Sequence, residues 1–165
     1  MDNKILKSSK LVCLLALIPW GLWTLVIILR LLRFAGLINF NVYLGIDIAP
    51  IAWYDDEAII AQYIELTGYV ITNIMMIGMV FLFIYKSLKG MDVNEVFSRG
   101  NVMLLYGMAA VSFFYELFTS NRGILYGSRE LVLDTAPFTT PLILLVVAVF
   151  YRLALHAYEE NRLTI

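Results

Sequence analysis

The sequence predicts an all-α membrane protein: a four-transmembrane-helix bundle that forms a single domain over residues 1–165. The first observation is composition. Hydrophobic residues make up 61% of the chain and charged residues 15%, whereas soluble domains contain about 45–50% and about 25%. The second observation is the length of the apolar stretches, because a helix needs about 20 mostly apolar residues to cross a hydrocarbon core roughly 30 Å thick. Four stretches meet or approach this length, with predicted spans at about 11–32, 63–86, 100–120 and 136–156.

The start of the first span resembles a secretory signal peptide, because Lys4, Lys7 and Lys10 precede an apolar run. That run, Leu11 to Leu29, carries no charge and is longer than the roughly 7–15 residues of a signal peptide. It ends at Arg30 without a small-residue cleavage pattern. We therefore expect a retained spanning helix.

The connection after the first span alternates between apolar and polar residues. From Ile38 to Ile48 every even-numbered position is apolar, and Pro50 follows. A period of two is typical of a strand, and a strand needs a partner. A short apolar piece between glycines, residues 123–127, lies in the other connection on this side. We expect a small extracytoplasmic cap that contains a short β-strand or hairpin; the alternative is an irregular loop lying on the headgroups.

The other three helices have recognisable starts. The acidic run 55–57 precedes the second span, where negative charge is favourable against the helix dipole. Ser98 precedes the third span and is a preferred N-cap residue. Pro137 falls in the first turn of the fourth helix, where its missing N–H costs little. These residues predict where each helix begins.

Basic residues predict the orientation, because Lys and Arg near span ends favour the cytoplasm. With a cytoplasmic N-terminus, eight Lys and Arg residues lie inside, all five lysines among them, and four lie outside. We therefore expect both termini in the cytoplasm.

Charged residues near the span ends form the first candidate site, since polar groups in hydrocarbon usually face protein or water. Arg30 and Arg33 end the first span, Glu65 lies at the start of the second, and Glu116 lies near the end of the third. A buried carboxylate is tolerated when it is paired or protonated. We expect both glutamates to face the bundle interior and at least one to pair with an arginine. The cluster is then a ligand or proton site; the alternative is a structural ion pair or a set of interfacial charges that reach water.

Motifs for chemistry are missing from the sequence, which contains neither a Walker loop, a dinucleotide fingerprint, an HExxH pair nor a GxSxG elbow. The chain has one histidine and one cysteine. We therefore predict no catalytic, cofactor-binding or metal-binding residues and no enzyme activity. The basic residues form no stripe, so nucleic-acid binding is not expected either.

Two short segments carry a resemblance. Phe97 and Ser98, followed by Asn101, lead into the third span, and the chain closes with residues 159–165, EENRLTI. Together with the four spans, these motifs are similar to the bacterial four-helix membrane family catalogued as domain of unknown function 2975. Arg162 stands where that family is expected to carry an acidic residue. The resemblance implies a protein of the bacterial cytoplasmic membrane, without enzyme activity, that is associated with small helix-turn-helix regulators and has a regulatory or accessory role.

The same segments form the second candidate site, a cytoplasmic docking surface. The fourth helix is expected to continue past the membrane and fold against the connection between the second and third spans. Lys86 or Arg99 would then face one of the glutamates near the C-terminus. The alternative is a solvated helix end with capping only. The candidate residues are Phe97, Ser98, Asn101, Glu159, Glu160 and Leu163.

Two functions follow from these sites. The first is a non-enzymatic membrane protein that binds a partner: a regulator, another membrane protein or a second copy of the chain. The alternative is a small transporter or ion or proton pathway through the Arg/Glu cluster, for which four helices would usually have to oligomerise. The inner halves of the second and fourth spans, residues 74–84 and 142–150, hold almost no polar side chains. This pattern favours the first function.

Overall fold

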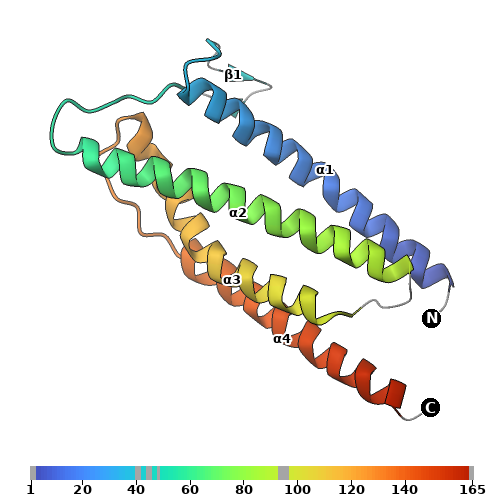
Figure 1. Cartoon of the computed structure of the whole chain (residues 1–165). Helices are drawn as coiled ribbons and strands as arrows, with labels where there is room; N and C mark the ends of the chain where they lie inside the picture. Colours follow the sequence, from blue (N-terminus) through green and yellow to red (C-terminus); the bar gives the residue numbers. More distant parts are fainter. Residues whose placement is uncertain (1–2, 40–41, 44–45, 48, 93–96, 164–165) are drawn as a thin grey trace.

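Four long helices make up most of the protein (Figure 1). The computed structural model describes residues 3–39, 42–43, 46–47, 49–92 and 97–163, and the side chains of residues 6–39, 49–91 and 97–161. The helices are α1 Asn3–Phe34, α2 Ile59–Asp92, α3 Arg99–Ser120 and α4 Ala136–Leu163. All four are long and apolar enough to cross a membrane, which confirms the four predicted spans. The protein is therefore a multi-pass membrane protein by the length and composition of its helices.

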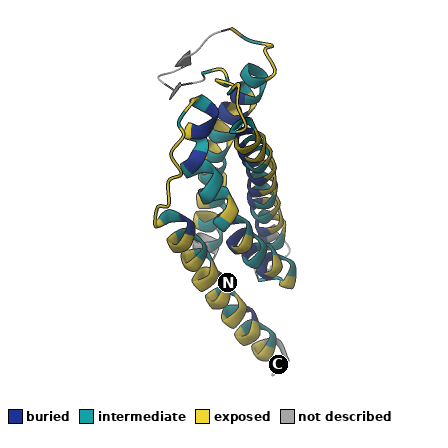
Figure 2. Cartoon of the chain, turned by 90° about the vertical axis from the view of Figure 1, so that its left-hand side faces the viewer, coloured by how far each residue is buried: buried dark blue, intermediate teal, exposed yellow. Residues whose placement is uncertain are grey.

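The helices pack in chain order, with α1 against α2, α2 against α3 and α3 against α4. Buried residues make up 33% and 28% of the most apolar segments of α2 and α3, but only 11% of those of α1 and α4. Figure 2 shows the exposed residues on the outer surfaces of the helices. These outer surfaces are rich in large apolar side chains, which suits contact with lipid.

The two ends of the bundle differ. At the proximal end lie the start of α1, the end of α2, the start of α3 and the end of α4 (Figure 1). At the distal end lie the connections between α1 and α2 and between α3 and α4, including the short 3₁₀ helix η1, Asn121–Tyr126. We use the names proximal end and distal end in this sense throughout.

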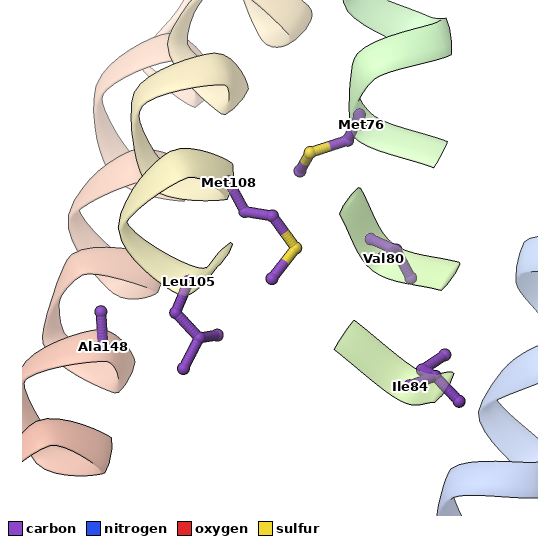
Figure 3. Close-up of a cluster of buried hydrophobic side chains, with 6 residues drawn as sticks. All are labelled: Met76, Val80, Ile84, Leu105, Met108 and Ala148. Atoms are coloured by element: carbon purple, nitrogen blue, oxygen red, sulfur yellow. The ribbon is translucent and has the colours of Figure 1, made fainter. Parts of the chain in front are cut away.

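An apolar core joins α2, α3 and α4 (Figure 3). Trp20 and Leu17 of α1 are partly buried against it. Without a hydrophobic driving force in lipid, such contacts stabilise the bundle mainly through van der Waals packing. We call this set the apolar layer, and its buried members are Met76, Val80, Ile84, Leu105, Met108 and Ala148.

The helix ends follow local chemistry that the sequence predicts. Gly36 has a φ of 72°, in the left-handed region that glycine adopts readily after a helix. Asp56 accepts a hydrogen bond from the backbone N–H of Ala58 through Oδ1 at 3.0 Å, in the turn ahead of α2, so the acidic run 55–57 precedes the first turn of the helix and does not form part of it. Ser98 is the N-cap of α3, as predicted, and its Oγ accepts a hydrogen bond from the backbone N–H of Asn101 at 3.2 Å.

The connection between α1 and α2 contains two short strands. Strand β1, Val42–Tyr43, pairs antiparallel with β2, Ile46–Asp47. This short antiparallel pair agrees with the predicted short β-strand or hairpin. Residues 40–41, 44–45 and 48 lie outside the described residues, so continuous extension from Ile38 to Ile48 stays a prediction. The other proposed partner lies mostly in η1. Side chains 40–48 lie outside the described residues, so the burial of the even-numbered positions stays a prediction.

Gln62 fastens the distal end to α2. Its side chain has no exposed surface and makes three hydrogen bonds. Oε1 accepts from the N–H of Tyr54 at 2.8 Å, and Nε2 donates to the carbonyl oxygens of Ala52 at 2.7 Å and Ile124 at 2.9 Å. One side chain therefore joins the connection after α1, the start of α2 and η1.

Asn121 has the same role for the connection before α4. Its Nδ2 donates to the carbonyl oxygens of Leu117 at 2.9 Å and Val132 at 3.0 Å, and its Oδ1 accepts from the N–H of Val132 at 2.7 Å. The two distal connections are thus held by buried amide side chains. Their predicted position outside the cytoplasm stays a prediction.

Candidate functional site

Buried polar residues occupy one face of α2 in its distal half. Their spacing of three or four positions places them on the same side of the helix. Further along the same face, the polar residues give way to the apolar layer. The distal half of this helix interface is therefore polar and the middle apolar. The polar residues are Gln62, Glu65, Tyr69, Thr72 and Asn73, all with an exposed fraction of 7% or less.

Arg30 of α1 reaches this face. Its side chain is 5% exposed, and Nη1 donates a hydrogen bond to the Tyr69 hydroxyl at 2.9 Å. The guanidinium carbon lies 5.7 Å from the ring centroid of Trp23, a distance typical of a cation–π contact. Arg30 and Tyr69 thus link α1 to α2 by a buried, charge-assisted hydrogen bond.

The predicted ion pair is wrong. In the part of the chain that the structure describes, neither Glu65 nor Glu116 forms an ion pair with Arg30 or Arg33. The physical reason is the position of Tyr69, one turn beyond Glu65 on the same face, whose hydroxyl receives the arginine. Arg33 donates instead to the carbonyl oxygen five residues ahead of it, in the connection after α1, at 2.8 Å.

The two glutamates have different surroundings. Glu65 is 5% exposed, so its predicted position in the interior is correct, and its Oε1 has no hydrogen-bond partner within the described structure. Glu116 on α3 is only partly buried. The four residues of the first candidate site therefore do not form one ionic cluster. Arg30 and Glu65 belong to the buried polar face, while Arg33 and Glu116 lie at its margin.

We expect Tyr69→Phe to lower the free energy of unfolding by about 1.5 kcal/mol, because the buried guanidinium of Arg30 loses an acceptor. Denaturant titration in detergent micelles measures the change. Tyr63→Phe is the matched control on the exposed side of α2 and should change stability by less than about 0.5 kcal/mol. A double-mutant cycle with Arg30→Gln should show coupling; strictly additive effects would contradict the contact.

Several residues of the proximal candidate site contact one another or α4, while their role as a docking surface stays a prediction. Asn101 is 1% exposed, and its Nδ2 lies 3.2 Å from both the Ser87 Oγ on α2 and the Tyr151 hydroxyl on α4. The Phe97 ring lies 5.1 Å from the Tyr151 ring and 6.2 Å from the Tyr158 ring, measured between centroids. Phe97, just before α3, therefore packs against α4.

The expected charge pairing at this end is confirmed for one pair. The Nε atom of Arg99 lies 3.3 Å from the Oε1 atom of Glu159, and both side chains are well exposed. Glu160 lies 3.8 Å from Nδ1 of His156, measured from its Oε1. An exposed pair of this kind contributes at most about 1 kcal/mol. The side chain of Leu163 lies outside the described residues, so its part in a docking surface stays a prediction.

A second exposed ion pair joins the two distal connections. Nη2 of Arg129 donates to Oδ2 of Asp56 at 2.6 Å, and the guanidinium lies 4.9 Å from the ring centroid of Tyr54. The hydrogen bond from Arg129, aided by that from the backbone N–H of Ala58, lowers the pKa of Asp56 below its ordinary value of 3.8. Because the folded-state pKa is depressed, this contribution to stability is present above the unfolded-state pKa and is lost as the pH falls through the folded-state value.

We therefore expect the Asp56 carboxyl to titrate below 3.8, and we expect Arg129→Gln to raise that midpoint toward the ordinary value. Carbon-13 NMR of the carboxyl group, recorded across the acid range in micelles, measures both. Arg122→Gln is the control, since it makes the same charge change in the same connection outside the pair. An Asp56 midpoint that is the same with and without Arg129 would refute the assignment.

Sequence reasoning missed Gln62. It lies one position before the predicted second span, so it was not counted among the polar residues within the spans. The signal was available, because Gln62 is three positions before Glu65 and seven before Tyr69 and so continues the same helix face. Among the described residues, no group of three or more His, Cys, Asp or Glu side chains is placed to hold a metal ion.

Comparison with protein-family models, with curated protein sequences and with solved structures found no match for this chain.

Proposed function

We propose that this protein is a non-enzymatic multi-pass protein of the bacterial cytoplasmic membrane that binds a protein partner in a regulatory or accessory role. The apolar layer carries the proposal. It lies between the polar face of α2 and the proximal end, and it is built from side chains of α2, α3 and α4 that bury one another. A polar solute would have to cross this layer, which favours binding over transport. The resemblance to the family of unknown function supports the same role.

The proximal end is the proposed docking surface. Phe97 is held by two tyrosines of α4, and Arg99 and Glu159 stand beside it with much of their surface exposed. An aromatic residue within a rim of exposed charges is a common arrangement in protein interfaces. The excess of basic residues near this end supports a cytoplasmic position for it.

A photo-crosslinking amino acid at Glu160 tests the proposal in native membranes. We expect a discrete crosslinked product from this position, and a product at twice the mass of the chain would identify the partner as a second copy. Matched controls are Arg129, which is similarly exposed at the distal end, and Phe150, which is exposed on the apolar part of α4. Equal products from all three positions, or none from Glu160, would reject the docking surface.

A separate experiment tests the orientation of the chain in the membrane. Reporter fusions after Asp55 and after the C-terminus should report opposite sides of the membrane, with the C-terminus in the cytoplasm. Both fusions on the same side would overturn the four-span topology. The opposite assignment would place the proximal end outside the cytoplasm and exclude a cytoplasmic partner.

The alternative function is a small transporter or a proton pathway, and the buried Glu65 favours it, because one of its carboxylate oxygens has no partner in the described structure. Proteoliposomes loaded with a pH-sensitive dye test this alternative. Proton movement that requires Glu65, and is lost in Glu65→Gln but kept in Glu116→Gln, would replace the binding proposal.

A further inference from the structure

A groove runs between α3 and α4 at the proximal end. Its volume is about 760 Å³, within the range of roughly 300–1,000 Å³ that small-molecule sites occupy. Its polar residues are Arg99, His156 and Glu159 at the proximal end, and Arg152, which lies one turn before His156 on α4 and three positions from Val149. Apolar side chains form the remaining walls: Val102, Met103, Tyr106, Val149, Leu153 and Leu155. The groove is therefore amphipathic along its length.

The charged end has an excess of positive charge. Arg99 is paired with Glu159 at 3.3 Å, whereas Arg152 forms neither a hydrogen bond nor an ion pair within the described structure. His156 is exposed and lies 3.8 Å from Glu160. Among the groove residues two arginines stand against one glutamate, and Glu160, outside the groove, lies beside His156, so the positive charge available to a ligand is that of Arg152. Arg152, an unpaired cation beside apolar walls, favours the binding of an anionic ligand.

The position of the groove along α4 adds a second constraint. Glu159 and Val149 are ten positions apart on this helix, a rise of about 15 Å, which is half of a hydrocarbon core roughly 30 Å thick. The charged end therefore lies near the membrane surface when the apolar end lies within one leaflet. A free anion would use the charges and leave the apolar walls bare. A phospholipid uses both.

We propose that this groove binds an anionic phospholipid, with its phosphate at Arg152 and His156 and an acyl chain along Met103, Tyr106 and Val149. Basic pockets between transmembrane helices on the cytoplasmic side are a known setting for acidic headgroups. Glu159 weakens the site and is held away from the phosphate by Arg99. The proposal is independent of a protein partner, and it holds whether or not the docking surface is used.

Native mass spectrometry of the full chain in detergent, titrated with single lipids, tests the site. We expect phosphatidylglycerol to bind more tightly than phosphatidylcholine. Arg152→Gln should weaken the binding of phosphatidylglycerol about fivefold, the effect of one basic residue near an acidic lipid surface. Lys89→Gln is the control, because it removes the same charge from an exposed position at the proximal end outside the groove. Equal losses from the two variants would mean unspecific attraction and would overturn the site.

A second pair of variants tests the apolar end and keeps the proposal open to refutation if Arg152→Gln does not fold. Val149→Trp should fill the groove and weaken lipid binding, whereas Phe150→Trp, next to it and outside the groove, should leave binding unchanged. Inorganic phosphate and glycerol 3-phosphate supply the headgroup chemistry without the chain. Displacement of the lipid by either anion at equal concentration would replace the lipid with a free anion, and equal binding of phosphatidylcholine would reject a headgroup site altogether.

Discussion

Gln62→Met is expected to destabilise the protein by about 3 kcal/mol, because it leaves buried backbone donors and acceptors without partners. Methionine keeps the length and flexibility of the side chain and removes its polar atoms. The N–H of Tyr54 and the carbonyl oxygens of Ala52 and Ile124 would each lose a hydrogen bond of 2.7 to 2.9 Å. Denaturant unfolding in micelles, followed by circular dichroism, measures the loss.

The control for this variant is Thr67→Val, a polar-to-apolar change of similar shape on the exposed side of α2. It should alter stability by less than about 0.5 kcal/mol. Hydrogen exchange adds a local readout, since the amide of Tyr54 should lose protection in Gln62→Met. If that amide stays protected and stability is unchanged, then Gln62 does not hold the distal end.

Gly68→Ala is expected to give the second largest effect, a net loss of roughly 2 kcal/mol from overpacking. A Cβ atom at Gly68 would overlap three ring atoms of Phe118 on α3, so the ring has to leave its place between the helices. Thermal unfolding in detergent reports the change. Phe118→Leu in the same chain should recover part of the loss, because it removes the clashing edge.

Gly78→Ala is expected to change stability in the opposite direction. No atom lies within 4 Å of a Cβ placed at Gly78, and both glycines are inside α2. Alanine is favoured over glycine within a helix by about 0.5–1 kcal/mol, so this variant should be slightly more stable than the parent. Two variants that shift stability in the same direction would show that the Phe118 contact is not what distinguishes them.

The four spans could be predicted because apolar length is a property of the chain alone. The capping role of Ser98 was also within reach, since it rests on local chemistry at a helix end. The Arg99–Glu159 pair joins residues 60 positions apart and could be predicted because the order of the spans brings the start of α3 and the end of α4 to the same end of the bundle. The partner of Arg30 could not be predicted. Whether the guanidinium meets Glu65 or Tyr69 depends on the rotation of α2 and on side-chain reach, and neither is encoded in spacing.

The distal connections show the same limit. An alternation of period two predicts extended backbone, but it says nothing about which segments pair, and here Val42–Tyr43 pairs antiparallel with Ile46–Asp47. Hydrogen bonds from Gln62 to Ile124 and from Asn121 to Val132 join segments that only the folded chain brings together. Residues whose partners are backbone groups of another segment leave little trace in composition.

The buried hydrogen bonds of Gln62 and Ser87, near the two ends of α2, determine how the protein responds to bilayer thickness. Gln62 and Ser87 are 25 positions apart, from 62 to 87, which is about 37 Å along a helix and more than a hydrocarbon core of roughly 30 Å. Because Asn101 holds Ser87 and Ile124 holds Gln62, α2 cannot slide along α3 to shorten this span. In a thinner membrane the helices must tilt together or the lipid must deform. We therefore expect the fold to accommodate only a limited range of acyl-chain lengths without tilting.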